Sequence, residues 1–213
     1  MSRHYAVCVA LISSMLAPLL QGAASEQRGE IIGDAMYVNC EYRVAAQFPS
    51  EPKVRDITYR DGTRNAPARQ FYVERDAGLL SVTVVYFADG PDFDPQFIAN
   101  AAETLRGRGE VRYDFPVFYD DPGIPGRQLQ IALTNGRFLH GSVYMANHRL
   151  YITEATAPSN DFPALLFSQS VSLIDEKGTD LDTNPVGVAT SAVGTSAGLP
   201  SRQYDCSRIN RRP

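Results

Sequence analysis

The sequence predicts an α+β fold in which an antiparallel β-sheet, built from two meanders, is covered by two helices. First, segments rich in β-branched and aromatic residues follow one another in two blocks. Second, turn signals such as Asp61-Gly62 and Asn135-Gly136 separate consecutive segments, as is typical of hairpins. Third, each block is followed by a segment with helical features. The expected order is therefore meander, helix, meander, helix.

The first block is expected to contain four strands. Pro49 and Pro52 stop its first strand, because proline has no N–H to donate to a ladder. In its last strand Leu80, Val82 and Val84 share one face, which we expect to pack against the helix that follows. The expected strands are residues 42–48, 54–59, 68–75 and 79–87.

The first helix is expected to follow Asp92 or Asp94, either of which can cap it. Pro95 suits the first turn, and Gly107 ends the helix. Its apolar residues recur at helical spacing and form one stripe: Phe97, Ile98, Ala101, Ala102 and Leu105.

The second block is expected to pair antiparallel throughout. Pro116 marks an edge or a bulge, and the proline- and glycine-rich residues 121–126 form a loop. If a three-residue turn joins the last two strands, Met145 pairs with Arg149, and His140 lies directly opposite Glu154. The expected strands are residues 111–119, 127–133, 138–145 and 150–156.

The second helix begins near Asn160 or Asp161, with Pro163 in its first turn. After Asp175 the composition changes to small and polar residues that can bury little core. We therefore expect one α+β domain at 38–175 and a tail at 176–213. Residues 176–200 are expected to be flexible, and the tail ends in a segment containing Cys206.

Residues 1–24 have the organisation of a signal peptide. Arg3 and His4 give a basic start, an apolar run extends from Tyr5 to Leu20, and small residues precede Ser25. The run is too short for a comfortable membrane span. We expect cleavage near Ala24, a periplasmic or extracellular product and no integral membrane segment in the mature chain.

Two cysteines remain after cleavage, Cys40 and Cys206. An even pair in an oxidising compartment predicts one disulfide bond. Two buried thiols, or pairing between chains, are the alternatives. The two cysteines are not close together in the sequence, as the paired ligands of a zinc site such as C-x-x-C would be.

Three local patterns resemble those of the PsbP extrinsic subunits of photosystem II and of uncharacterised bacterial secreted proteins with that fold. They are Phe48-Pro49 at the end of an early strand, Arg149-Leu150-Tyr151-Ile152 in a late strand, and Phe167-Ser168-Gln169-Ser170-Val171 in a helix. The resemblance covers residues 40–175. It implies a non-enzymatic binding or assembly factor and carries over no functional residue.

The chain contains no zinc-protease motif, phosphate-binding loop or dinucleotide fingerprint. The remaining catalytic candidate is a general acid–base pair of His140 and Glu154. Ser142 is near His140 but has no evident activating group. The alternative interpretation of the pair is a structural contact across two strands.

Asp89, Asp92 and Asp94 group three carboxylates in one loop. Loop oxygens of this kind are calcium ligands, although the spacing is not that of an EF-hand. Capping of the following helix explains Asp92 or Asp94 without a metal. We expect neither a metal nor a cofactor.

Two functions from different classes remain. The formal net charge of −4 argues against nucleic acid as a partner. The first function is a non-enzymatic envelope protein that binds a partner protein, a peptide or a small lipid-like amphiphile. The alternative is a small hydrolase or lyase that uses His140 and Glu154. Polar groups converging on His140 in a deep cleft would favour the enzyme, and an apolar groove would favour binding.

Overall fold

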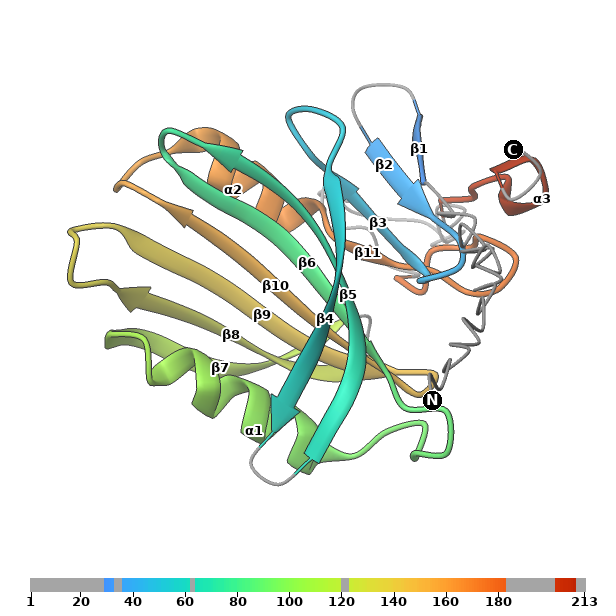
Figure 1. Cartoon of the computed structure of the whole chain (residues 1–213), viewed down its shortest axis with the longest axis horizontal. Coiled ribbons are helices and arrows are strands. Elements are labelled where there is room, and N and C mark those ends of the chain that lie inside the picture. The colour runs from blue at the N-terminus through green and yellow to red at the C-terminus, as the bar shows by residue number, and fades with distance from the viewer. Residues whose placement is uncertain (1–28, 33–35, 62–63, 120–122, 183–201, 210–213) are drawn as a thin grey trace, which may run out of the picture.

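The structure is a computed structural model that describes residues 29–32, 36–61, 64–119, 123–182 and 202–209. The expected signal peptide lies outside these residues. Within the described residues, two antiparallel sheets and three helices make up the fold (Figure 1). The elements are β1 (Glu30–Ile32), β2 (Met36–Asn39), β3 (Val44–Gln47), β4 (Lys53–Asp61), β5 (Arg64–Arg75), β6 (Gly78–Tyr86), α1 (Pro95–Arg106), β7 (Glu110–Tyr119), β8 (Ile124–Ala132), β9 (Phe138–Ala146), β10 (Arg149–Ala157), α2 (Phe162–Ser170), β11 (Ser172–Leu173) and α3 (Cys206–Ile209).

The large sheet has seven strands in the order β4-β5-β6-β10-β9-β8-β7. It consists of two meanders, as predicted, and β6 joins them by pairing with β10 from Arg149↔Tyr86 to Ala155↔Leu80. The second sheet, β1-β2-β3-β11, was not predicted. Strand β3, which corresponds to the expected first strand of the first meander at residues 42–48, belongs to this second sheet. The expected loop at 121–126 is also too long, because β8 already begins at Ile124.

The two faces of the large sheet pack against different partners (Figure 1). Helix α1 packs on one face, where its predicted apolar stripe contacts residues such as Val85 and Leu139. The small sheet and α2 lie on the other face, where Leu80, Val82 and Val84 pack with Phe71, Tyr151 and Phe167. Our expectation that Leu80, Val82 and Val84 face α1 is therefore wrong. Both faces of β6 are buried, including the face that carries Ser81 and Thr83, so alternation alone could not assign them.

The turn between β9 and β10 sets the register of the second meander. Asn147 and His148 both have positive φ angles, 51° and 59°, as the two central residues of a type I′ hairpin turn require. Arg149 therefore pairs with Ala146. The predicted three-residue turn, with its pair of Met145 and Arg149, is wrong.

Both main helices have the predicted caps. The Asp94 carboxylate accepts a hydrogen bond from the backbone N–H of Gln96, and Gly107 closes α1. The Asp161 carboxylate accepts from the backbone N–H of Ala164 at 3.0 Å and also binds Arg75. These contacts satisfy N–H groups that have no partner within the helix.

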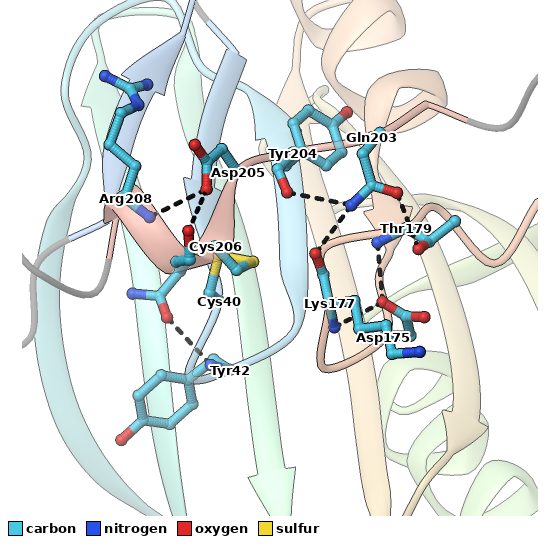
Figure 2. The surroundings of a disulfide bond; sticks show 12 residues. Cys40, Tyr42, Asp175, Lys177, Thr179, Gln203, Tyr204, Asp205, Cys206 and Arg208 are labelled. Carbon is cyan, nitrogen blue, oxygen red and sulfur yellow. Dashed lines mark hydrogen bonds between the residues drawn. A yellow bond between two sulfur atoms is a disulfide. The ribbon is translucent and has the colours of Figure 1, made fainter.

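The C-terminal segment returns to the small sheet (Figure 2). Cys40 and Cys206 lie at disulfide distance, with their Cα atoms 5.6 Å apart, as predicted. Before this point, residues 175–182 form a turn in which Asp180 is buried. Residues 183–201, which include most of the expected flexible stretch, lie outside the described residues. No helix in the described ranges is both long and apolar enough to cross a membrane.

Candidate ligand-binding site

A pocket of about 310 Å³ opens between the β2–β3 turn and the large sheet. We call it the arginine pocket. Its apolar wall is formed by Pro67 of β5 and Val84 of β6, while Ile57 and Ala68, which also line it, belong to the core on the α1 face. This volume is near the lower end of the range typical of small-molecule sites.

Strand register explains why the side chains of this pocket meet. Asp56 of β4 pairs with Arg69 of β5, and Arg69 pairs with Val84 of β6. Two residues after Val84 on β6, Tyr86 pairs with Arg149 of β10. Directly opposed residues project on the same face, so four strands contribute to one wall.

Arg69 is already neutralised by a carboxylate. Its Nε and Nη2 atoms donate to the two oxygens of Asp56 at 2.8 and 3.1 Å. The hydrogen bond to Asp56 raises the pKa of Arg69. The guanidinium also lies 5.0 Å from the ring centroid of Tyr42, and only 17% of the side chain is exposed. Arg69 is therefore held in a fixed position with its charge compensated.

Arg149 has no such partner among the described residues. Its guanidinium lies 4.7 Å from the ring centroid of Tyr86 and donates from Nη1 to the Asn147 carbonyl at 3.1 Å. A longer contact of 3.5 Å joins Nη2 to the Glu41 carbonyl. In the described part of the chain, no carboxylate lies within ion-pair distance of this guanidinium. Burial lowers the pKa of Arg149, although a guanidinium stays charged at any physiological pH.

The rim of the pocket is the turn that carries Glu41 and Tyr42. The backbone N–H of Tyr42 donates to Asn39 Oδ1 at 3.0 Å, and Glu41 is preceded by the disulfide-bonded Cys40 (Figure 2). Arg43, in a left-handed conformation with φ of 55°, forms an ion pair with Glu176. The rim is thus fastened on both sides to the C-terminal segment.

His140 lies in a separate and smaller pocket of about 100 Å³ on the α2 side of the sheet. Polar side chains that include Gln128, Ser142 and Gln169 surround it, and burial lowers its pKa. Among the described residues, no carboxylate lines this pocket. The His140 ring contacts Gln130, whose Nε2 atom lies 3.4 Å from His140 Nε2.

Glu154 does not reach His140. The observed register pairs His140 with Ala155, and Glu154 with Gly141. Successive residues of a strand project to opposite faces, so the two side chains lie on different sides of the sheet. Glu154 instead forms an ion pair with Arg108, just beyond α1. The predicted cross-strand pair, on which the hydrolase or lyase alternative depended, is therefore wrong.

The three loop carboxylates have separate environments. Asp94 caps α1, and Asp92 Oδ1 lies 2.8 Å from His148 Nε2, while Asp89 is exposed. Within the described residues, no group of three or more histidine, cysteine, aspartate or glutamate side chains is arranged to hold a metal ion. The arginine pocket, in contrast, was not predicted from the sequence. Its residues come from four strands and a turn, and their meeting could be foreseen only from the β6–β10 register.

Comparison of the chain with protein-family models, with curated proteins and with solved structures finds no match. Function must therefore be inferred from the chemistry of the site itself.

Proposed function

We propose that this protein is a non-enzymatic binding protein of the cell envelope that receives a small lipid-like amphiphile in the arginine pocket. The observation that carries the proposal is the combination of an apolar wall with a half-buried guanidinium, that of Arg149, in one pocket. A mostly apolar cavity with a few convergent polar groups is the usual form of a small-molecule site. The proposal also agrees with the binding role that the resemblance to PsbP-like proteins implies.

The described residues support binding better than catalysis. In this part of the chain, His140 has no acidic partner to orient it and no activated nucleophile beside it. His148 places Nδ1 2.7 Å from the Gly90 carbonyl and Nε2 near Asp92, so both ring nitrogens are occupied by structural contacts. Neither histidine is therefore arranged for proton transfer to a substrate.

Export is part of the same proposal. The basic, apolar and small-residue succession of residues 1–24 supports secretion, and the disulfide between Cys40 and Cys206 is compatible with an oxidising compartment. N-terminal sequencing of the exported protein should begin at or near Ser25. Recovery of the uncleaved chain from the cytosol would contradict this part of the proposal.

The absence of tryptophan from the sequence allows a direct test of ligand binding. Tyr86→Trp would introduce a single tryptophan, whose emission can be excited selectively, at the pocket and keep an aromatic ring beneath Arg149. Phe115→Trp is a matched control, because Tyr86 is 44% exposed and Phe115, on the distant strand β7, is 43% exposed.

Both variants would be titrated with decanoate and with decanol below their aggregation concentrations. The expected result is a saturable blue shift in the emission of the Tyr86→Trp variant with either compound, without a shift in the control. An equal response of both fluorophores, or no response of either, would contradict binding in the arginine pocket.

A further inference from the structure

We infer that the arginine pocket selects amphiphiles with a single anionic headgroup, a carboxylate or a phosphate, and that Arg149 is the residue that binds this group. The inference rests on the proposed function, since it specifies the ligand of the same pocket. It depends on the local charges, on the donors that remain on Arg149, and on the size of the apolar wall.

The arginines around the pocket differ in how their charges are compensated. Arg69 is bound by both oxygens of Asp56, and Arg43 is bound by Glu176. Within the described residues, the contacts of Arg149 are backbone carbonyls and the Tyr86 ring. An added anion would therefore give Arg149 the charged partner that Arg43 and Arg69 already have.

Arg149 retains donors for such a partner. A guanidinium carries five N–H donors, and the Asn147 and Glu41 carbonyls account for two contacts. Tyr86 lies against the guanidinium, which fixes its orientation. Because the group is half-buried, an anion beside it would be attracted more strongly than at a fully solvated site.

The exposed residue Glu41 sets an opposing charge at the rim. Its repulsion would lower the affinity of the pocket for an anionic ligand and leave the affinity for a neutral ligand unchanged. Glu41 therefore offers a second test that does not depend on changing Arg149.

The volume of the pocket limits the apolar part of the ligand. About 310 Å³ corresponds to roughly ten water molecules in the liquid. This space suits one short chain or a compact ring system packed against Val84 and Pro67, and it is too small to enclose two lipid chains. The ligand is thus a small single-chain amphiphile.

The experiment is isothermal titration calorimetry of the disulfide-bonded mature protein with four probes of equal chain length. Decanoate, decyl phosphate, decanol and decylammonium differ only in the headgroup. At least one of the two anions should bind about tenfold or more tightly than decanol, and decylammonium should bind most weakly. The ratio of decanoate to decyl phosphate affinity then decides between the two headgroups.

Arg149→Gln should reduce the affinity for the preferred anion about tenfold and leave the affinity for decanol unchanged. Arg112→Gln, at an exposed arginine of β7 that pairs with Glu110, is the matched control and should change neither. Glu41→Gln should strengthen anion binding severalfold, which keeps the inference testable if Arg149→Gln fails to fold.

Three outcomes would overturn the inference. Equal affinity for decanol and both anions would remove the headgroup assignment and leave the proposed function intact. An equal loss of anion binding in the Arg149 and Arg112 variants would show that net charge, not this site, attracts the ligand. Failure of all four probes to bind would contradict both the inference and the proposed function.

Discussion

The guanidinium of Arg149 lies 4.7 Å from the ring centroid of Tyr86, its directly opposed neighbour in the β10–β6 pair. This pair is at the end of the ladder that joins the two meanders. The contact therefore depends on both halves of the large sheet, since β6 closes the first meander and β10 closes the second. The arginine pocket therefore forms only when β6 and β10 pair in the observed register.

Replacement of Tyr86 by alanine should weaken both the fold and the pocket. Loss of the ring contact with Arg149 is expected to lower the free energy of unfolding by about 0.5–1 kcal/mol. Tyr86→Phe keeps the ring and should cost less. Urea denaturation of the two variants measures the difference, and equal losses would show that the ring face contributes nothing.

The two cores of the sheet should respond independently to truncation. Leu80 is buried on the face covered by the small sheet and α2, while Ile98 of α1 is buried against the opposite face. Leu80→Ala and Ile98→Ala should each lower the free energy of unfolding by about 2–5 kcal/mol. Because the residues belong to separate cores, the double variant should equal the sum within about 0.5 kcal/mol. A larger deviation in chemical denaturation would mean that the two faces are coupled.

His140 should make stability depend on pH in the weakly acidic range. Burial lowers its pKa below the ordinary 6.5, so between the two values the unfolded chain binds more protons than the folded one. The free energy of unfolding therefore falls as the pH decreases below about 6.5. His140→Gln should reduce this fall and change stability near pH 8 by less than about 1 kcal/mol. An unchanged slope in urea titrations at several pH values would contradict the assignment.

The disulfide should stabilise the protein mainly through the unfolded chain. Cys40 and Cys206 are 166 positions apart, for which the chain-entropy model gives an upper figure of about 5 kcal/mol. We expect the replacement of both cysteines by serine to lower the free energy of unfolding by about 2–5 kcal/mol. Denaturation of the wild-type protein with and without reductant provides the comparison. A loss of only a few tenths of a kcal/mol would show that the bond adds little constraint.

Local patterns predicted the elements that depend on local chemistry. Asn135-Gly136 marked a hairpin, and Asp94 and Asp161 marked the starts of two helices, because turn and cap preferences act over a few residues. The wrong register at His148 arose because Asn147 and His148 form a two-residue turn with both φ angles positive, a conformation that a non-glycine pair rarely signals.

Features that depend on distant parts of the chain were not predictable. Strand β11 has two residues and pairs with β3, which lies far earlier in the chain, so no periodicity could reveal it. The arginine pocket has the same origin. Arg69 and Arg149 belong to different meanders, and only the tertiary pairing of β6 with β10 brings them to one wall.

The disulfide bond makes the backbone between the two cysteines cyclic. The bond between Cys40 and Cys206 closes a ring that contains every strand from β3 to β11 and both main helices. A single backbone cut within this ring leaves one molecule, because the two fragments stay linked through sulfur. Beside the ring closure, Glu30 and Arg208 form an ion pair at 3.1 Å, so the described chain enters and leaves the ring at one place. The part of the protein between the two cysteines is in effect a cyclic polypeptide, and it can be nicked without being divided.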